Sequence, residues 1–346
     1  MRTIDWINGG IELIDQTLLP GRLEIARIET VDALIGAIRR LAVRGAPALG
    51  VAGALGVALA ASSEPGPAER DAAVARLRAA RPTAVNLAWG VDQAAACLPG
   101  GFPGVLARAL EIRDDDVAAC VSMGVYGAAL LTELAPARDR LAVMTVCNTG
   151  GLAAVERGTA LGVIQTLHER GALAEALAME TRPLLQGARL TAWELARMGA
   201  PYRLVADSAG PFLLARGHAD AVVIGADRIA ADGDTANKIG SYALALGARR
   251  AGVPFVVVAP ETTIDMSTPT GAAIAIEDRP AGEITEIRGV RLAPDGAAAL
   301  NPAFDVTPHD LITAIVTDRR VIRLDRGETL ATVSPGSRAV EGSGLR

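Results

Sequence analysis

The chain has 346 residues, enough for one large domain or two ordinary domains, each with its own hydrophobic core. Half of the residues are hydrophobic, but only 3% are aromatic and the net charge is -5. This composition argues against nucleic acid as a partner, because a basic face and stacking rings are lacking, and against a membrane, because the longest apolar runs fall short of the roughly 20 residues of a membrane span.

The first 130 residues are predicted to form a mainly helical domain after a short β element. Residues 12–29 alternate apolar and polar side chains around Leu19-Pro20-Gly21-Arg22, a pattern typical of a β-hairpin. Thr30 is predicted to cap the helix that follows, in which apolar residues recur at helical spacing. Further helices are predicted over residues 47–61, 69–79, 82–97 and 115–134, with loops at 62–67 and 98–103.

Beyond residue 130, short β-branched runs alternate with helical segments. Strands are predicted over residues 141–146, 177–180, 202–206, 221–224, 255–259 and 314–317. Short strands separated by helices are typical of a parallel, doubly wound sheet. We therefore predict an α/β protein with a small, mainly helical domain over residues 1–130 and a Rossmann-like domain over residues 131–346.

A ligand site is predicted at the carboxyl edge of this sheet, where open parallel sheets bind their ligands. The first five predicted strands are each followed by unusual polar residues: Cys147-Asn148-Thr149-Gly150-Gly151, Glu180-Thr181-Arg182-Pro183 with Gln186, Asp207-Ser208, Gly225-Ala226-Asp227-Arg228 and Pro260-Glu261-Thr262-Thr263. The chain has only five Asn residues, and two of them adjoin Cys147 and Lys238.

Two Arg-containing segments have the outline of a phosphate cradle. Pro47 in the first turn of a predicted helix leaves backbone N–H groups and a positive helix end beside Arg44, Gly45 and Ala46. Arg81, ahead of Pro82 and Thr83, repeats the arrangement before the next predicted helix. In both segments the alternative is an ordinary helix start with a solvated Arg, and the pattern alone leaves the choice open.

Cys147 and Asp227 are the candidate catalytic residues. A Gly-rich turn after Cys147 is predicted to lead into a helix from about Leu152, and a thiol at a helix N-terminus has a stabilised thiolate that can act as base or nucleophile. Asp227 follows an apolar strand, so desolvation is expected to raise its pKa and suit it to general acid catalysis, unless it caps a turn or pairs with the adjacent Arg. Cys97 and Cys120 lie in helical stretches and are predicted to be core residues.

One cation stands out by its rarity. Of the 34 basic residues, 33 are Arg and one is Lys238. Arg presents a planar fork and Lys a compact point charge, so a single Lys in such a chain indicates a position that requires an ammonium. Its place after Asn237, close to the Asp227 loop, favours function over an accidental surface Lys.

No metal and no cofactor are predicted. The three His and three Cys residues have no metal-ligand spacing, and no Gly-x-Gly-x-x-Gly follows a strand. The odd number of cysteines and an N-terminus without a signal pattern predict a cytoplasmic protein.

Taken together, these motifs resemble the methylthioribose-1-phosphate isomerases, a family homologous to the regulatory subunits of eukaryotic translation factor 2B and to archaeal ribose-1,5-bisphosphate isomerases. The resemblance runs from about Leu41 to Val321, through RGAPALG, RPTAVNL, CNTGG, ETRPLLQGARLTAWEL, GADRIAADGDTANKIGSYALA, PTG and NPAFDVTP. It implies a catalytic pair, Cys147 and Asp227, and a set of phosphate and sugar contacts: Arg44, Gly45, Ala46, Arg81, Gln186, Asn237 and Lys238.

The chain departs from this family at the catalytic loop. The family usually has His before the catalytic Cys and Ala after the first Gly of the loop, where this chain has Val146 and Gly151. The departure leaves the 5-substituent of the substrate open, with 5-deoxyribose 1-phosphate and ribose 1,5-bisphosphate as alternatives to the methylthio sugar. An alternative from another class is a non-catalytic regulatory subunit, which would need neither the acid nor the thiol.

The reaction that the resemblance implies converts 5-methylthioribose 1-phosphate into 5-methylthioribulose 1-phosphate in methionine salvage, a route of methionine biosynthesis. The anomeric phosphate blocks a free aldehyde, so the ring must open with the phosphate attached. Asp227 is assigned the protonation of the ring oxygen, and Cys147 the management of the C2 hydrogen, as a base in an enolisation or a partner in a hydride shift. The resemblance also implies a homodimer.

Overall fold

The computed structural model describes residues 1–63, 66–81 and 84–335, and the contacts within it divide the chain into two units. Unit 1 comprises Met1–Ser122 and Asn148–Gly162, and unit 2 comprises Met123–Cys147 and Val163–Arg346. The boundary predicted at residue 130 falls inside helix α5 (Gly101–Leu134), which continues through the division between Ser122 and Met123. The segment that returns to unit 1 starts directly after Cys147, and no change in composition marks it.

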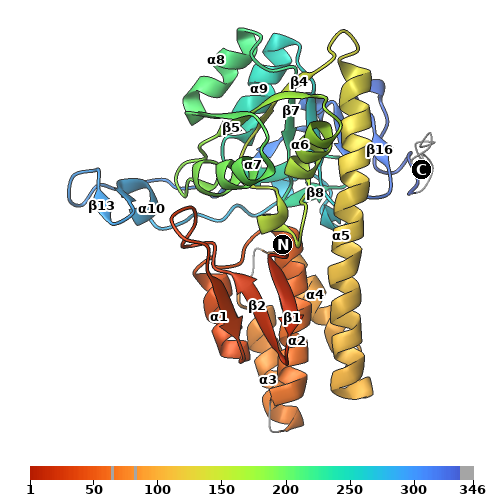
Figure 1. Cartoon of the computed structure of the whole chain (residues 1–346), viewed down its shortest axis with the longest axis vertical. Coiled ribbons are helices and arrows are strands. Elements are labelled where there is room, and N and C mark those ends of the chain that lie inside the picture. The colour runs from red at the N-terminus through yellow and green to blue at the C-terminus, as the bar shows by residue number, and fades with distance from the viewer. Residues whose placement is uncertain (64–65, 82–83, 336–346) are drawn as a thin grey trace. The chain divides into compact units, whose positions relative to one another are not determined.

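Unit 1 combines a small antiparallel sheet with helices. Its strands β1 (Ile4–Ile7), β2 (Gly10–Ile14) and β3 (Ile25–Ile28) form a meander, and the hairpin predicted over residues 12–29 is confirmed as β2 and β3. Figure 1 shows β1 and β2 beside the helices of this unit. These are α1 (Val31–Arg39), α2 (Ala46–Ser63), α3 (Pro67–Arg78), α4 (Val85–Ala95) and the first part of α5.

The starts of α1 and α5 show how local sequence sets helix ends. The Thr30 hydroxyl accepts a hydrogen bond from the Ala33 N–H at 3.2 Å, so the predicted N-cap is confirmed. The loop predicted over residues 98–103 is wrong in its second half, because α5 already begins at Gly101. Pro103 lies in the first turn, where its missing N–H interrupts no helical hydrogen bond.

Two helical stretches are long and apolar enough to cross a membrane, although the sequence analysis expected none. They are α2, whose residues are 72% buried, and Leu98–Leu134, whose most apolar window is 39% buried. The core helix of a soluble protein has the same composition, because apolar side chains on every face are needed when the helix packs on all sides. In α2 the buried residues run without a break from Ala48 to Ala60, so packing within unit 1 accounts for its apolar character.

Unit 2 contains a seven-stranded sheet in the order β16-β15-β10-β7-β4-β5-β6. Its strands are β4 (Leu141–Thr145), β5 (Leu173–Met179), β6 (Tyr202–Val205), β7 (Ala221–Ile224), β10 (Phe255–Val258), β15 (Ala314–Val316) and β16 (Val321–Ile322). All six predicted strands are present and parallel, whereas β16 adds an unpredicted antiparallel edge. The order reverses between β4 and β7, as in a doubly wound fold.

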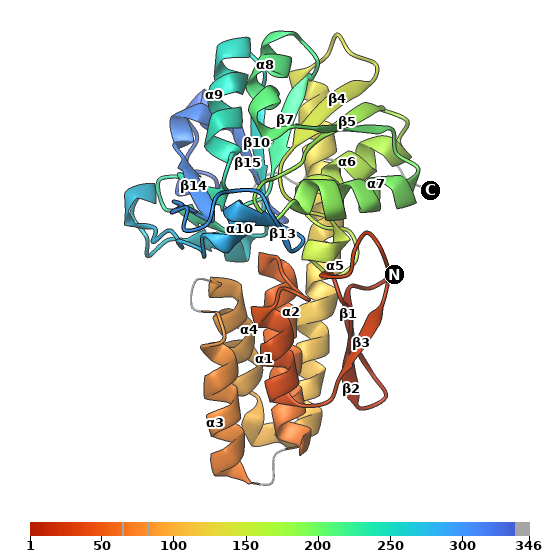
Figure 2. The ribbon, with the colours of Figure 1, turned by 90° about the vertical axis from the view of Figure 1, so that its left-hand side faces the viewer.

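Helices cover both faces of this sheet, which buries the strands and explains their continuous apolar sequence. The helices α8 (Gly210–Ala215) and α9 (Ser241–Ala251) pack on one face with β7 and β10. Figures 1 and 2 show them on the side opposite α6 (Ala160–Glu169). Helix α7 (Ala192–Met198) connects β5 to β6.

A second sheet in unit 2 was not predicted. It has the order β11-β8-β9-β14, with β8 (Arg228–Ala230), β9 (Thr235–Lys238), β11 (Ile264–Asp265) and β14 (Phe304–Thr307). A further hairpin joins β12 (Glu286–Ile287) and β13 (Val290–Arg291) after the short helix α10 (Gly282–Thr285). These strands have two to four residues each, which is too short to establish a period of two in the sequence.

Candidate functional site

Cys147 and Asp227 lie at the ends of two neighbouring strands. Cys147 follows β4, Asp227 follows β7, and these strands pair in parallel with Met144 opposite Val222. The chain order of the sheet reverses between them. Doubly wound proteins bind their ligands at the carboxyl end of this switch point, so both residues occupy the position that the fold offers to a ligand.

The backbone at Cys147 is in the left-handed region, with φ of +66°, which is unusual for a residue other than Gly. Its side chain is nearly buried, at 9% exposed. The Cys147 N–H donates to the Thr181 hydroxyl at 2.9 Å, and its carbonyl accepts from the Thr191 hydroxyl at 2.6 Å. Side chains therefore satisfy both backbone groups of this residue at the point where the strand ladder ends.

The helix predicted from about Leu152 is wrong. Only a short 3-10 turn, Gly151–Ala153, follows Cys147, and the next α-helix begins at Ala160. The loop closes on itself instead: Gly150 bridges Gly158, and the Thr159 N–H donates to the Thr149 carbonyl at 2.8 Å. Cys147 therefore does not lie at the N-terminus of an α-helix, which was the expected source of stabilisation for its thiolate.

Asp227 leads from the central sheet into the second sheet. Its backbone N–H donates to the Ala236 carbonyl at 2.9 Å, and the next residue, Arg228, pairs with Ala236 in the β8–β9 ladder. This register places Asp227 beside Asn237 and Lys238 at the end of β9. The Asp227 loop and the Asn237-Lys238 pair, which the sequence linked only by proximity in the chain, are thus neighbours across a hairpin.

Lys238 is a buried cation, 7% exposed. Its Nζ donates to the Ala303 carbonyl at 2.8 Å and lies 4.5 Å from the centre of the Phe304 ring. A carbonyl oxygen and an aromatic face both stabilise a positive charge, so these two contacts help to hold the ammonium in place. Asn237 is also buried, and its Nδ2 donates to the Ser241 hydroxyl at 2.8 Å.

Asp305 is a charged neighbour of Lys238 that the sequence analysis did not single out. Burial raises the pKa of Asp305 to about 6, although the Gly240 and Tyr242 N–H groups and the Lys238 charge act in the opposite direction. The carboxylate accepts from these two N–H groups at 2.7 and 3.1 Å, at the start of α9. Its presence in the NPAFDVTP motif was the available signal in the sequence.

Gln186 carries an unsatisfied polar atom. The residue is 6% exposed, and its Oε1 has no hydrogen-bond partner among the described residues. Buried acceptors are rarely left unpaired in folded proteins, so an orphaned oxygen at a predicted site calls for a ligand donor. A sugar hydroxyl has the required chemistry.

Arg44, Gly45 and Ala46 lie in unit 1, where the chain enters α2. Gly45 has φ of +94°, and a Cβ there would come within 2.5 Å of the Ala153 carbonyl oxygen, so only Gly fits. The buried Arg44 guanidinium donates to the Gln16 Oε1 at 3.2 Å, to the Asn148 carbonyl at 3.1 Å and to the Asn148 side-chain oxygen. Arg44 therefore forms hydrogen bonds with Asn148, the residue that follows Cys147, and the sequence did not predict this contact.

Arg81 lies between α3 and α4 and is partly buried. The phosphate cradle predicted from Arg81-Pro82-Thr83 includes Pro82 and Thr83, which lie outside the described residues. Helix α4 begins at Val85, after Ala84. The structure thus places Arg81 ahead of a helix start, while Cys147, Gln186, Asp227, Asn237 and Lys238 belong to unit 2.

Asp116, on α5 in unit 1, anchors the loop that follows Cys147. Its carboxylate accepts a hydrogen bond from the Val155 N–H at 3.0 Å. Burial raises the pKa of Asp116 to about 7, and the Val155 hydrogen bond offsets this only in part. The group is thus poised to change its charge near neutral pH.

This shift predicts a pH dependence of stability. The folded Asp116 holds its proton up to about pH 7 and the unfolded group only to about 3.8, so the free energy of unfolding should fall as pH rises through this window, by up to about 1.4 kcal/mol per pH unit. Asp116→Asn should keep the acceptor for Val155 and remove this slope. Urea denaturation at pH 4, 5.5 and 7 tests it, with the exposed Asp115→Asn as control; equal slopes for wild type and Asp116→Asn would contradict it.

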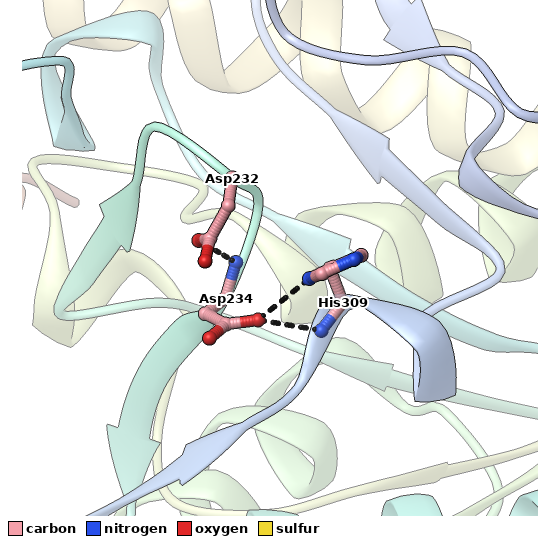
Figure 3. A group of neighbouring side chains, drawn as sticks. All are labelled: Asp232, Asp234 and His309. Atoms are coloured by element: carbon pink, nitrogen blue, oxygen red, sulfur yellow. Dashed lines mark hydrogen bonds and ion pairs between the residues drawn. The ribbon is translucent and has the colours of Figure 1, made fainter. Parts of the chain in front are cut away.

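Three side chains outside these positions come close enough to suggest a metal site. The ligand atoms of Asp232, Asp234 and His309 lie within 4.8 Å of one another (Figure 3). Asp234 accepts from the His309 N–H, the His309 ring and the Gly271 N–H, and Asp232 accepts from the Asp234 N–H. These hydrogen bonds hold the β8–β9 turn next to the residues that follow β14. They explain why the three side chains lie close together.

The chain matches the model of the initiation factor 2 subunit family over residues 42–323. It belongs to this family. It is similar to a methylthioribose-1-phosphate isomerase of Anaeromyxobacter sp. (strain K), at 51% identity over 94% of both chains. It is also similar to a 5-deoxyribose 1-phosphate isomerase of Moorella thermoacetica, at 47% identity over 96% of this chain and 97% of the relative.

Among solved structures, the chain is similar to a 5-methylthioribose 1-phosphate isomerase from Pyrococcus horikoshii OT3. The TM-score is 0.85 and the identity 39%, over 93% of this chain and 92% of the other. The predicted fold class, a helical region followed by a mainly parallel Rossmann-like sheet, is thereby confirmed. All residues of the predicted site lie within residues 42–323, the region that the family model matches.

Proposed function

We propose that this chain is an aldose–ketose isomerase that converts 5-methylthioribose 1-phosphate into 5-methylthioribulose 1-phosphate, a step of methionine salvage. The observation that carries the proposal is the placement of a thiol and a carboxyl, Cys147 and Asp227, at adjacent strand ends of the switch point. The isomerases to which the chain is similar along most of its length support the same activity. The proposed reaction takes place within one sugar phosphate and needs no cofactor.

The proposed catalytic roles of Asp227 and Cys147 follow from the protons that a carboxyl and a thiol can give or accept. Asp227 gives a proton to the ring oxygen as the bond from that oxygen to C1 breaks, which leaves an open-chain cation whose positive charge is shared between C1 and the oxygen of the phosphate that C1 still carries. The C2 hydrogen then moves to C1 while the C2 hydroxyl gives its proton to the Asp227 carboxylate and becomes the ketone, which removes the positive charge and restores the acid. Cys147 serves this transfer, either by taking the hydrogen as a proton or by lining the path of a hydride.

The remaining predicted residues are proposed to bind the phosphate and the sugar. Lys238 supplies a positive charge that is already desolvated, which strengthens its attraction to an anion. Gln186 and Asn237 supply amide groups, and the Gln186 oxygen would gain the partner that it lacks. Arg44, Gly45, Ala46 and Arg81 are proposed to add N–H groups and charge.

An assay with matched substrates tests the function. The purified chain should isomerise 5-methylthioribose 1-phosphate, and product formation can be followed by the appearance of the ketone at C2. 5-deoxyribose 1-phosphate and ribose 1,5-bisphosphate should be compared at equal concentration, because the Moorella relative is a 5-deoxyribose 1-phosphate isomerase. Faster turnover of either alternative would reassign the substrate, and no turnover of any would favour the non-catalytic subunit.

Removing the Lys238 ammonium should weaken the binding of phosphorylated substrate. Lys238→Ala is expected to raise KM about 10- to 100-fold, because a charge-assisted contact in a buried site is lost. Lys238→Arg should also impair binding, since the longer side chain moves the positive charge away from the point that the Ala303 carbonyl and the Phe304 ring define for the ammonium. Arg250→Ala, which removes an exposed cation from α9, is the control; unchanged KM in both Lys238 variants would exclude the phosphate role.

We also propose that the protein acts in the cytoplasm as a homodimer. None of its three cysteines, all of which lie in the described part of the chain, forms a disulfide, as in proteins of a reducing compartment. The apolar helix α2 is mostly buried in the core of unit 1, which agrees with a soluble protein. Light scattering of the purified chain measures the oligomeric state directly.

A further inference from the structure

The backbone around Cys147 is held in an uncommon conformation by a set of hydroxyl groups. Cys147 and Thr181 both have left-handed backbones, with φ of +66° and +65°. For residues other than Gly this conformation is costly and persists only where the surroundings impose it. Both residues follow neighbouring strands of the central sheet, β4 and β5, at their carboxyl ends.

Two Thr hydroxyls impose this conformation on Cys147 from opposite sides. The Thr181 hydroxyl accepts a hydrogen bond from the Cys147 N–H at 2.9 Å and donates one to the Met179 carbonyl at 3.1 Å. The Thr191 hydroxyl donates to the Cys147 carbonyl at 2.6 Å. Both Thr residues are almost completely buried, so water does not compete for these bonds.

The two hydroxyls are themselves fixed by further contacts. The Asp207 carboxylate accepts the Thr181 N–H at 2.8 Å and the Arg182 N–H at 2.6 Å, which holds the left-handed turn at Thr181. Thr191 closes a π-helix, Gly187–Thr191, a distortion that often occurs at functional sites. A Cβ at Gly187 would lie 1.6 Å from the Met179 carbonyl oxygen, so the π-helix packs directly on the end of β5.

We infer that Thr181 and Thr191 are positioning residues for the Cys147 thiol. The backbone conformation of a residue sets the direction of its Cα–Cβ bond, so the two hydroxyls fix the position of the Cβ atom from which Sγ extends. Reacting groups must be held to within a fraction of an ångström, and a displacement of about 1 Å can cost on the order of 100-fold in rate. This inference rests on the proposed function, in which Cys147 takes part in the movement of the C2 hydrogen.

The test compares variants that remove or keep each hydroxyl. Thr191→Val and Thr181→Val keep the shape of the side chain and delete the hydrogen bond, whereas Thr191→Ser and Thr181→Ser keep the bond. The control is Thr307→Val, because Thr307 is a buried residue of β14 whose hydroxyl has no partner among the described residues. Circular dichroism and melting temperature identify variants that fail to fold. If a Val variant fails to fold, the Ser variant at the same position is compared with wild type instead.

Two readouts separate positioning from general structural damage. The first is turnover: we expect kcat to fall about 10- to 100-fold in the Val variants with KM within about threefold of wild type, and to recover in the Ser variants. The second is the alkylation rate of Cys147, mapped by mass spectrometry, which should rise at least about fivefold in the Val variants as the nearly buried thiol is released. Cys97 in the same molecules is the internal reference and should react at an unchanged rate.

The possible results are distinct. Alkylation of Cys147 at the wild-type rate in the Val variants, equal losses in Ser and Val variants, or a parallel rise at Cys97 each overturn the inference. If Cys147 becomes more reactive while kcat stays at the wild-type value, the positioning stands but the thiol is not used, which contradicts the proposed function. A loss of kcat in Thr307→Val as large as in Thr191→Val overturns the inference as well, because the effect then follows any buried hydroxyl.

Discussion

Asp227→Asn is expected to reduce kcat by about 100- to 10,000-fold, the range typical of a lost general acid. The amide keeps the shape of the carboxyl and its ability to accept a hydrogen bond, but it cannot give a proton to the ring oxygen. Without that proton the ring oxygen leaves as an alkoxide, and ring opening becomes the slow step. Substrate affinity should change little, because the phosphate contacts are assigned to other residues.

The matched control for this variant is Asp232→Asn in the same β8–β9 segment. Asp232 lies in the turn at the far end of the hairpin, where its carboxylate accepts the Asp234 N–H at 3.0 Å. An amide at this position keeps that acceptor, so turnover should stay close to wild type. If Asp227→Asn and Asp232→Asn retain the same activity, Asp227 is not the acid and the catalytic pair has to be reassigned.

The central sheet could be predicted from the sequence because its strands are buried on both faces. Residues such as Ala221–Ile224 form uninterrupted apolar runs, and the predicted strand there has the observed bounds. The second sheet gave no such signal, since β9 reads Thr-Ala-Asn-Lys and the other strands of the sheet have only two to four residues. These strands are specified by pairing across the chain, with Asn237 opposite Asp305, and not by a local pattern.

Residues of the proposed site could be singled out from the sequence where their residue type is unusual, but the long-range contacts around them could not. The single Lys and the polar residues after each strand could be read directly from the sequence. The Thr191 hydroxyl and the Cys147 carbonyl form a hydrogen bond between residues 44 positions apart, and Arg44 and Asn148 form one across 104 positions. Sequence periodicity cannot predict contacts at such separations. The helix predicted after Cys147 was wrong for the same reason: contacts with Gly158 and Thr159, further along the chain, close the loop and were not visible in the local sequence.

Cys147→Ser is expected to reduce kcat by an amount comparable to or larger than Asp227→Asn if the thiol acts as a base. The serine hydroxyl has a far higher pKa than a thiol and is therefore a poor base at neutral pH. Side-chain volume changes little, so the hydroxyl groups of Thr181 and Thr191 should still hold the backbone. Cys97→Ser, at a partly buried position on another element, is the control and should keep wild-type turnover.

Substrate carrying deuterium at C2 separates the two routes that remain for Cys147. In an enolisation the deuteron is transferred to the thiolate, where it can exchange with water, so product formed in light water should lose part of its label. In a hydride shift the deuterium moves directly to C1 and stays there in full, and Cys147→Ser should then retain more activity, because the thiol only stabilises charge along the path. Loss of label together with a severe Ser defect establishes the base. Full retention with a mild defect establishes the shift, and wild-type turnover in Cys147→Ser removes the thiol from the mechanism.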